Sequence, residues 1–305
     1  MIRHLLLLLI CVVSQISVCK SYDKDSTENS KPPPTLIFGF DYFPAKLMTR
    51  PVAPGADDLK LQIDNWMLGF SLPFQKSELS TITHSIEYHR LSINYLNAIP
   101  DLGALVETTH SLQYSLIWEK VLNEKWDLLT IINPGLASDF EGSLSKDDLI
   151  LTLAIAGIRK YNERLSIGYG VGFNPNFGTH HPLPVLALSW NNGRNMKIET
   201  IFPINLSFAY RPNPIFDLGM DFTLDGSSYH GNPDTYGAKN PQLRYSVTKG
   251  GPSITFNIFP WLHLKCAGGI TLLRRLEFYD GSMEAGSFDI KQSGFLSFNL
   301  IVGSN

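Results

Sequence analysis

One stretch of the chain carries residue types suited to acid–base chemistry. The run "THSIEYHR" brings Glu87 and His89 two positions apart, with Ile86 and Tyr88 interleaved. In an extended strand such neighbours alternate between two faces, so we expect Glu87 and His89 to share the inner face and His84 to point outward. A carboxylate beside an imidazole can exchange protons, but charged ladders inside β-barrels often only pair with one another. We favour the ladder and predict no catalytic residue.

A second set of charged residues lies further along the chain. Asp217 and Asp221 fall on the same face of "FDLGMDFTL", and Arg211, His263 and Lys265 lie on other predicted strands. Placed inside a barrel, these groups would form a polar network lining the lumen. Such a network would set an ion preference if the lumen were open.

Cofactor and metal motifs are missing from the sequence. It contains no glycine-rich phosphate loop, no zinc-ligand spacing and no Gly-x-Ser-x-Gly turn. The acidic stretch with Asp139, Glu141, Asp147 and Asp148 could bind calcium, although a solvated acidic loop is the favoured interpretation. We therefore predict neither a cofactor nor a metal site.

The elements that position these side chains are strands. In "WMLGFSLPF" (residues 66–74), large apolar residues alternate with small ones, and such two-residue periods recur along the chain while no helical stripe appears. The pattern predicts an all-β fold, a single antiparallel transmembrane β-barrel of about 12–14 strands, with 14 preferred. We expect strands at 36–44, 59–74, 81–96, 109–121, 126–134, 148–160, 164–174, 183–191, 196–202, 205–211, 214–225, 241–259, 261–275 and 290–302.

The connections support a barrel over a soluble sandwich. Every second predicted link is short, as expected for periplasmic turns, and most of the others are long, apart from the link at 203–204. We expect a bulge at Gly250-Gly251 within one long strand. Inward glycines at 168, 170 and 172 would leave space in the lumen, or would only relieve crowding.

Aromatic residues mark one end of the predicted strands. Trp118, Trp126, Trp190 and Trp261 lie beside predicted short turns, and Tyr161 lies in another. Indole and phenol side chains favour the membrane–water boundary, so we predict an aromatic girdle at this end. Aromatic side chains filling the end of a soluble core are the alternative.

The N-terminus reads as a secretory signal over residues 1–21, with Arg3 and His4 before an apolar run. Cleavage after Cys19 or after Ser21 fits, and lipidation of Cys19 is a less favoured alternative. Residues 22–35 form a polar, proline-rich leader that we expect to be disordered, and residues 36–302 form the barrel domain.

Composition narrows the partners. Charged residues make up 17% of the chain, which is a low share for a soluble domain. The net charge is -3, and the sequence lacks the basic patch that nucleic-acid binding requires. The expected partners are the lipid bilayer of a bacterial outer membrane and the barrel-assembly machinery. The chain ends in Gly303, Ser304 and Asn305 rather than in an aromatic residue, a departure from many such barrels.

Two segments resemble a known family. They are "KWDLLTIINPGLASDF" (residues 125–140) and "HPLPVLALSWNNGRNMKIETIFPINLSFAYRP" (residues 181–212), which contains a proline-rich strand start, an Asn-Gly turn and a proline before a short strand. Both are similar to uncharacterised bacterial outer-membrane β-barrel proteins defined only as a domain of unknown function. The resemblance implies a barrel and an outer-membrane location over most of residues 36–302, and it implies no reaction or substrate.

Three functional hypotheses stay open at this point. The first is an outer-membrane barrel acting as a passive pore, a transporter or a structural surface protein, with an unknown substrate and no enzymatic activity. The second is a soluble secreted β-sandwich that binds a ligand in its core. The third and weakest is a lipid-modifying enzyme built on a barrel.

Overall fold

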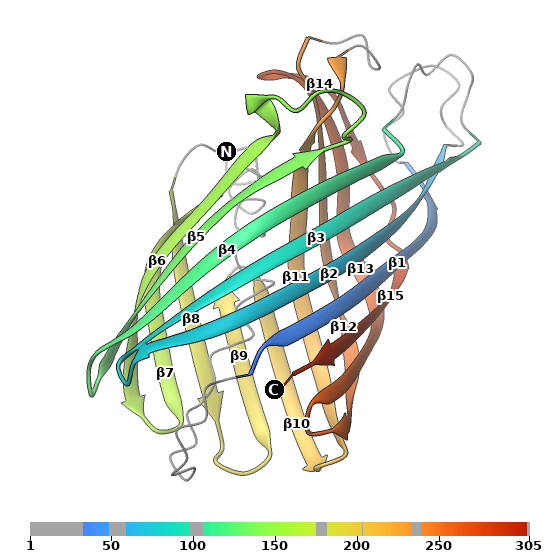
Figure 1. The fold of residues 1–305 in the computed structure, drawn as a ribbon. Coiled ribbons are helices and arrows are strands. Elements are labelled where there is room, and N and C mark those ends of the chain that lie inside the picture. The colour runs from blue at the N-terminus through green and yellow to red at the C-terminus, as the bar shows by residue number, and fades with distance from the viewer. Residues whose placement is uncertain are drawn as a thin grey trace.

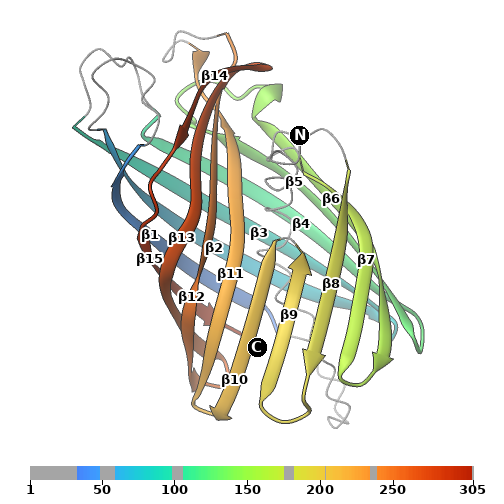
Figure 2. The ribbon, with the colours of Figure 1, turned by 180° about the vertical axis from the view of Figure 1, so that it is seen from behind.

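The computed structural model describes residues 33–48, 59–97, 106–174, 182–202, 204–233 and 239–303, so the predicted signal and most of the leader lie outside the described residues. The chain folds into a closed antiparallel β-barrel of 14 strands (Figures 1 and 2). Its strands are β1 (Thr35–Leu47), β2 (Lys60–Ser77), β3 (Ser80–Leu96), β4 (Thr108–Asn123), β5 (Trp126–Ser138), β6 (Leu149–Asn162), β7 (Leu165–Phe173), β8 (Leu183–Asn191), β9 (Met196–Phe202), β10 (Asn205–Asn213), β11 (Phe216–His230), β12 (Pro241–Phe259), β13 (Leu262–Asp280) and β15 (Gly294–Val302).

The ring closes because β15 lies between β1 and β13. Seven register pairs, from Leu36 with Val302 to Tyr42 with Leu296, join β1 to β15. The barrel class and the 14 predicted strands are confirmed. The soluble sandwich is wrong, because a closed ring has no second sheet.

One further strand was missed. β14 (Met283–Asp289) lies in the predicted loop 276–289 and pairs with the outer half of β13. The last barrel strand begins at Gly294 rather than at 290, because the residues before Gly294 are not part of the continuous register between β15 and β13. There Ile290 donates its backbone N–H to Arg274, and Thr271 donates its own to Ser293.

The two ends of the barrel differ as predicted. Tight connections at 78–79, 124–125, 163–164, 192–195, 214–215 and 260–261 lie at one end, called here the turn end. The opposite end, called the loop end, carries the longer connections and the short link between β9 and β10. The turn end corresponds to the periplasmic side of outer-membrane barrels.

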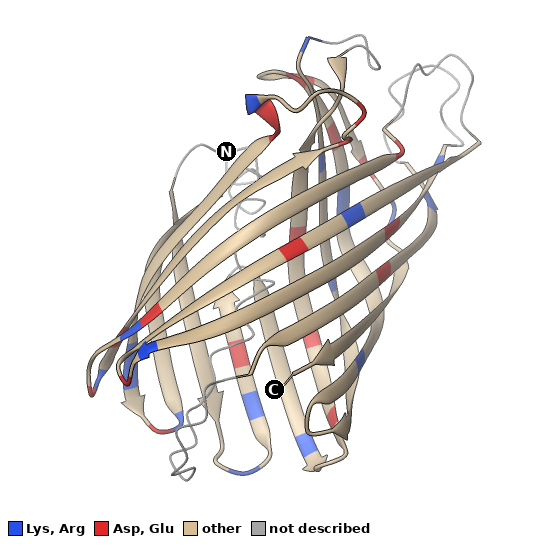
Figure 3. Cartoon of the chain, viewed as in Figure 1, with Lys and Arg blue, Asp and Glu red and all other residues tan. Residues whose placement is uncertain are grey.

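The outer surface is apolar. Trp66, Leu68 and Phe70 are 41%, 49% and 45% exposed, while Gly69 between them is buried on the inner face. Figure 3 shows charges of both signs near the two ends of the barrel and a smaller number along the middle of the strands. An apolar exterior around a closed barrel requires lipid rather than water. The protein is therefore an outer-membrane barrel.

None of the helices in the described part of the chain is both long and apolar enough to cross a bilayer.

The bulge of the β12–β13 pair is not where the sequence placed it. β12 runs through Gly250-Gly251 without a shift, and the register changes between Thr248 and Lys249, where β13 carries Leu272 as an extra residue. The glycines serve another purpose. A Cβ on Gly251 would lie 2.2 Å from the backbone oxygen of Gly268, so the two strands approach too closely for any side chain.

The wall is uneven in height. β7 to β10 have seven to nine residues each, whereas β11 to β13 have fifteen to nineteen. Figure 2 shows β9 and β10 ending well below the neighbouring β11. Beyond them, His230 at the end of β11 pairs with Ser138 at the end of β5. This contact joins the two long walls across the loop end.

Candidate functional site

The predicted Glu87–His89 pair lies inside the barrel. Glu87 is 7% exposed, and its Oε2 atom is 3.3 Å from His89 Nε2. The register places Gly69 of β2 opposite Glu87, and a Cβ there would lie 3.2 Å from the Glu87 side chain. The glycine thus makes room for the carboxylate on the inner wall. Ile86 is 54% exposed, so the facing of this strand is as expected.

The second predicted set forms separate pairs. Lys265 Nζ lies 2.7 Å from Asp221 Oδ2, and Arg211 Nη2 donates to Asp217 Oδ2 at 2.7 Å near the turn end. His263 was expected in the same network as the aspartates, but its Nδ1 atom lies 2.8 Å from the side-chain oxygen of Asn257 instead. The aspartates are therefore matched by local cations.

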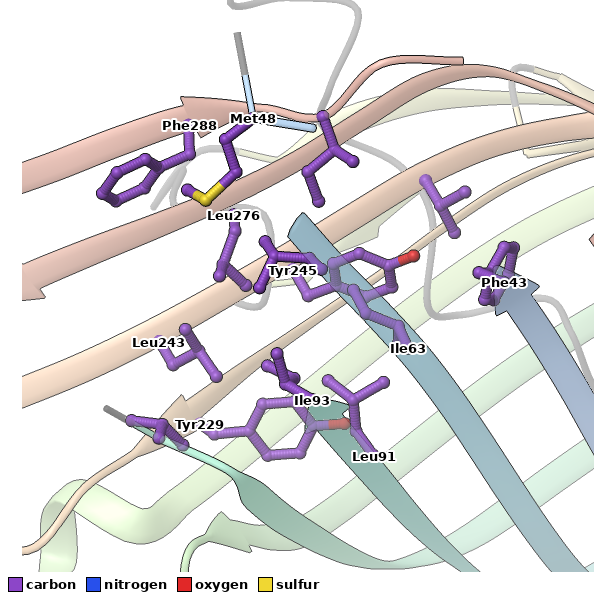
Figure 4. Close-up of a cluster of buried hydrophobic side chains, with 14 of the residues drawn as sticks. Phe43, Met48, Ile63, Leu91, Ile93, Tyr229, Leu243, Tyr245, Leu276 and Phe288 are labelled. Atoms are coloured by element: carbon purple, nitrogen blue, oxygen red, sulfur yellow. The ribbon is translucent and has the colours of Figure 1, made fainter. Parts of the chain in front are cut away.

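The outer half of the lumen is filled by apolar side chains. Most come from the continuous run of strands from β3 through β1, β15 and β13 to β11, which curves around half of the barrel, and they pack as one cluster (Figure 4). This outer cluster consists of Phe43, Met48, Leu59, Leu61, Ile63, Leu91, Ile93, Val106, Ala137, Tyr229, Leu243, Tyr245, Val247, Leu276, Phe288, Ile290 and Phe295. Leu91 and Tyr229, from opposite walls, line one cavity about the size of a single water molecule. The cluster therefore crosses the lumen.

Charged residues lie within the outer cluster. Lys249 Nζ is 2.6 Å from Asp41 Oδ2, with Asp225 close enough to interact electrostatically. Arg274 is 2% exposed, and its guanidinium carbon lies 5.1 Å from the centre of the Phe43 ring. None of these four charged residues was predicted as a site residue.

The inward glycines do not widen the lumen. A Cβ on Gly170 would lie 2.4 Å from the backbone oxygen of Ile155, and one on Gly168 would lie 3.1 Å from the Cβ of Ala187. They sit against their neighbours on the inner wall and relieve crowding, which was one of the two expected roles. Beside them, a smaller apolar cluster that includes Leu129 and Ile131 lines the lumen.

The acidic loop between β5 and β6 is not simply solvated. Asp139 and Asp148 are 7% and 2% exposed. Asp148 Oδ1 is 3.0 Å from His230 Nδ1, and Asp139 Oδ2 accepts the backbone N–H of Asn232 at 2.7 Å. Together with the His230–Ser138 pairing, these bonds form what is called here the loop-end bridge. No cluster able to hold a metal ion occurs among the residues described.

The Asp148 carboxyl is held in its charged form. Burial by itself raises its pKa, but hydrogen bonds from the Ser145 backbone, the Ser138 side chain and His230 outweigh burial and lower the pKa overall. A short 3-10 turn at 146–148, capped by Ser145, positions this carboxyl. The sequence signal for this turn is the Ser145 to Asp148 spacing, which matches a capping box.

The predicted aromatic residues lie at the turn end. Trp118 Nε1 donates to Ser80 Oγ at 2.9 Å, and Trp261 is 53% exposed and stacks on Phe259. Trp126 and Tyr161 both lie near the Arg159 guanidinium, and Trp190 is the last but one residue of β8. That these residues form an aromatic girdle at the membrane–water boundary stays a prediction.

Solved structures with a similar fold include a channel of the outer membrane and a transporter. An outer-membrane channel from Pseudomonas putida F1 shares 12% identity and a TM-score of 0.44, covering 91% of this chain and 97% of that one. The P. putida toluene transporter TodX shares 10% identity and a TM-score of 0.39, covering 90% and 91%. LpxR from Salmonella typhimurium shares 9% identity and a TM-score of 0.37, covering 88% and 99%.

Sequence comparison gives the family. A search of curated proteins finds no match. The family profile described as "Domain of unknown function (DUF6268)" matches residues 72–304, which include β3 to β15 and the end of β2. The chain, itself an outer-membrane barrel, therefore belongs to the DUF6268 family.

Proposed function

We propose that this protein is a passive outer-membrane channel for small, largely apolar solutes, and that it is closed to inorganic ions in the described conformation. The observation that carries the proposal is the outer cluster, which crosses the lumen above an inner half whose charged residues are paired with one another. We also propose that it is not an enzyme, and insertion by the barrel-assembly machinery stays a prediction.

The energetics of the outer cluster favour apolar solutes. A small inorganic ion that enters it must give up most of its hydration against a mainly apolar surface, and such burial is costly. An apolar solute gains about 25 cal/mol for each Å² of its surface that leaves water. Hydrophobic constrictions in channels exclude ions in this way. Passage requires the packed side chains to move apart, so we expect slow, gated transport.

The paired charges of the inner half argue against a permanently open, cation-selective pore. Asp221 and Asp217 are already matched by Lys265 and Arg211, so they add little net negative charge to the lumen. The Glu87–His89 pair likewise satisfies itself. We therefore assign these residues to lining the wall and keeping it polar.

Uptake in cells tests the proposal. A Gram-negative host without its general porins would express the protein, and the rate of N-phenyl-naphthylamine entry would be followed by the fluorescence of this uncharged dye. We expect faster entry than in cells with empty vector, and no steady conductance in a planar bilayer. Tyr229→Ala, which removes a ring that is 3% exposed within the cluster, should speed entry further.

The matched control is Tyr169→Ala, since Tyr169 is 46% exposed on the outer face and its loss should leave entry unchanged. Both variants would first be shown to fold by their faster migration on a gel when unboiled. If folded protein at the cell surface gives no more dye entry than empty vector, the channel proposal is wrong and a structural role takes its place.

A further inference from the structure

Arg274 has hydrogen-bonding capacity that the described residues do not use. We propose that it binds the carboxylate of a small amphipathic solute whose apolar part lies in the outer cluster. This inference deepens the proposed function and rests on it, because it names one class of solute that the channel would take.

The guanidinium is buried and only partly bonded. Arg274 is 2% exposed and its Nη1 atom donates to Ser293 Oγ at 3.2 Å. Its Nε and Nη2 atoms have no hydrogen-bond partner within the described part of the chain. An arginine stays charged in a protein, and buried charges are ordinarily paired. An unpaired guanidinium at this depth therefore calls for an anion.

The other charges of the cluster do not supply that anion. Asp41 is 2.6 Å from Lys249, and Asp225 also lies within electrostatic reach of Lys249. Arg274 takes part in no ion pair among the described residues. The hydroxyl of Tyr245 lies beside the guanidinium and can donate to a bound anion as well.

The local fold turns Arg274 inward. Up to Thr271 the odd-numbered residues of β13 face the lumen, but the extra residue Leu272 reverses this alternation. Leu272 and Leu273 are accordingly 39% and 60% exposed on the outer face, and Arg274 pairs with the inward Val247. Bulges re-aim side chains in this manner beside functional sites. Without the extra residue Leu272, the alternation would place Arg274 on the lipid-facing side.

The two unused donors select the ligand. Nε and Nη2 lie on the same side of the guanidinium and offer parallel N–H groups, the arrangement that donates hydrogen bonds to both oxygens of a carboxylate. The Phe43 ring lies against the same guanidinium, at 5.1 Å from ring centre to Cζ, and apolar side chains surround it. A carboxylate attached to an aromatic ring or a short alkyl chain matches this combination.

Calorimetry on the purified, detergent-solubilised protein at neutral pH tests the site. The probes are benzoate and benzyl alcohol, which share a ring and differ in charge. We expect benzoate to bind more tightly, and Arg274→Gln to weaken benzoate by about tenfold or more, since it removes charged hydrogen bonds, while leaving benzyl alcohol unchanged. Arg274→Lys keeps the charge but not the paired donors, so it should restore only part of the affinity.

The control is Arg275→Gln on the same strand, whose side chain bonds to Asp289 rather than to the cluster. All variants would be checked for folding by gel migration. Benzoate binding that is absent, or that survives Arg274→Gln in folded protein, would overturn the site. Inorganic phosphate binding as tightly as benzoate would also overturn it, because the apolar part would then contribute nothing.

Failure of the site and failure of the channel can be told apart. Dye entry that persists in cells with Arg274→Gln, together with unchanged benzoate binding, removes the site and keeps the channel. Benzoate binding that depends on Arg274, in a protein that gives no dye entry, keeps the site and removes the channel.

Discussion

Phe222→Arg tests whether the outer face of β11 contacts lipid at the depth that the barrel geometry implies. Phe222 is 40% exposed and its ring covers Gly250 on the neighbouring strand. It lies six residues along β11 from Phe216 at the turn end. Six residues span about 20 Å of strand, or about 15 Å of height at a tilt of roughly 40°. The apolar band is about 25 Å tall, so position 222 falls near its middle.

An arginine at that depth should cost about 2–4 kcal/mol of unfolding free energy. The assay is reversible refolding into lipid vesicles across a urea series, with the folded fraction read from gel migration. Phe222→Leu is the control, because it shortens the side chain without adding charge and should cost much less. Asp221→Asn is the inward comparison; it removes the charge that pairs with Lys265 on a side chain that also accepts a hydrogen bond from Ser207. Equal costs for Phe222→Arg and Phe222→Leu would refute the assigned depth.

Three further results are expected. Leu276→Ala, at a fully buried position of the outer cluster, should cost about 2–5 kcal/mol, because it leaves a cavity; Leu300→Ala on the lipid face should cost less in the same refolding assay. Since the pKa of Asp148 is lowered, its stabilisation of the loop-end bridge is present at neutral pH and is lost as pH falls through that lowered pKa; trypsin cleavage after the exposed Lys146, compared between wild type and Asp148→Asn at neutral pH, should be faster in the variant. Gly251→Ala should prevent stable folding, seen as loss of the fast-migrating band, because its Cβ would meet backbone 2.2 Å away.

Strand number and facing could be read from the sequence because a two-faced wall imposes strict alternation. Leu68 and Gly69 illustrate this, since lipid contact and inner packing demand opposite side-chain sizes at successive positions. The alternation of short and long links indicated which end of each strand lies at the turn end. Glu87 followed from the same alternation, with its neighbours Ile86 and Tyr88 fixing the outer face.

The features that alternation could not reveal depend on where it breaks or on what meets across the barrel. Arg274 counts as outward by parity, and only the extra Leu272 brings it inside. The outer cluster was missed because residues such as Leu91 and Tyr229 lie on distant strands, and single-strand patterns do not tell whether a lumen is filled. His230 meets Asp148 only because the intervening strands are short.

The seam between β1 and β15 has a consequence for the order of assembly. It has seven register pairs, whereas β2 and β3 share seventeen, and it joins residues from opposite ends of the chain. Local hairpins can therefore form early. The seam needs β15, which is made last, so it must wait until the whole polypeptide has left the ribosome and crossed to the periplasm. Pairing between segments so distant in sequence is also slow in itself. Until then β1 and β13 each present an open edge. A chain truncated before Gly294 would keep both edges exposed and would depend on chaperones to avoid aggregation.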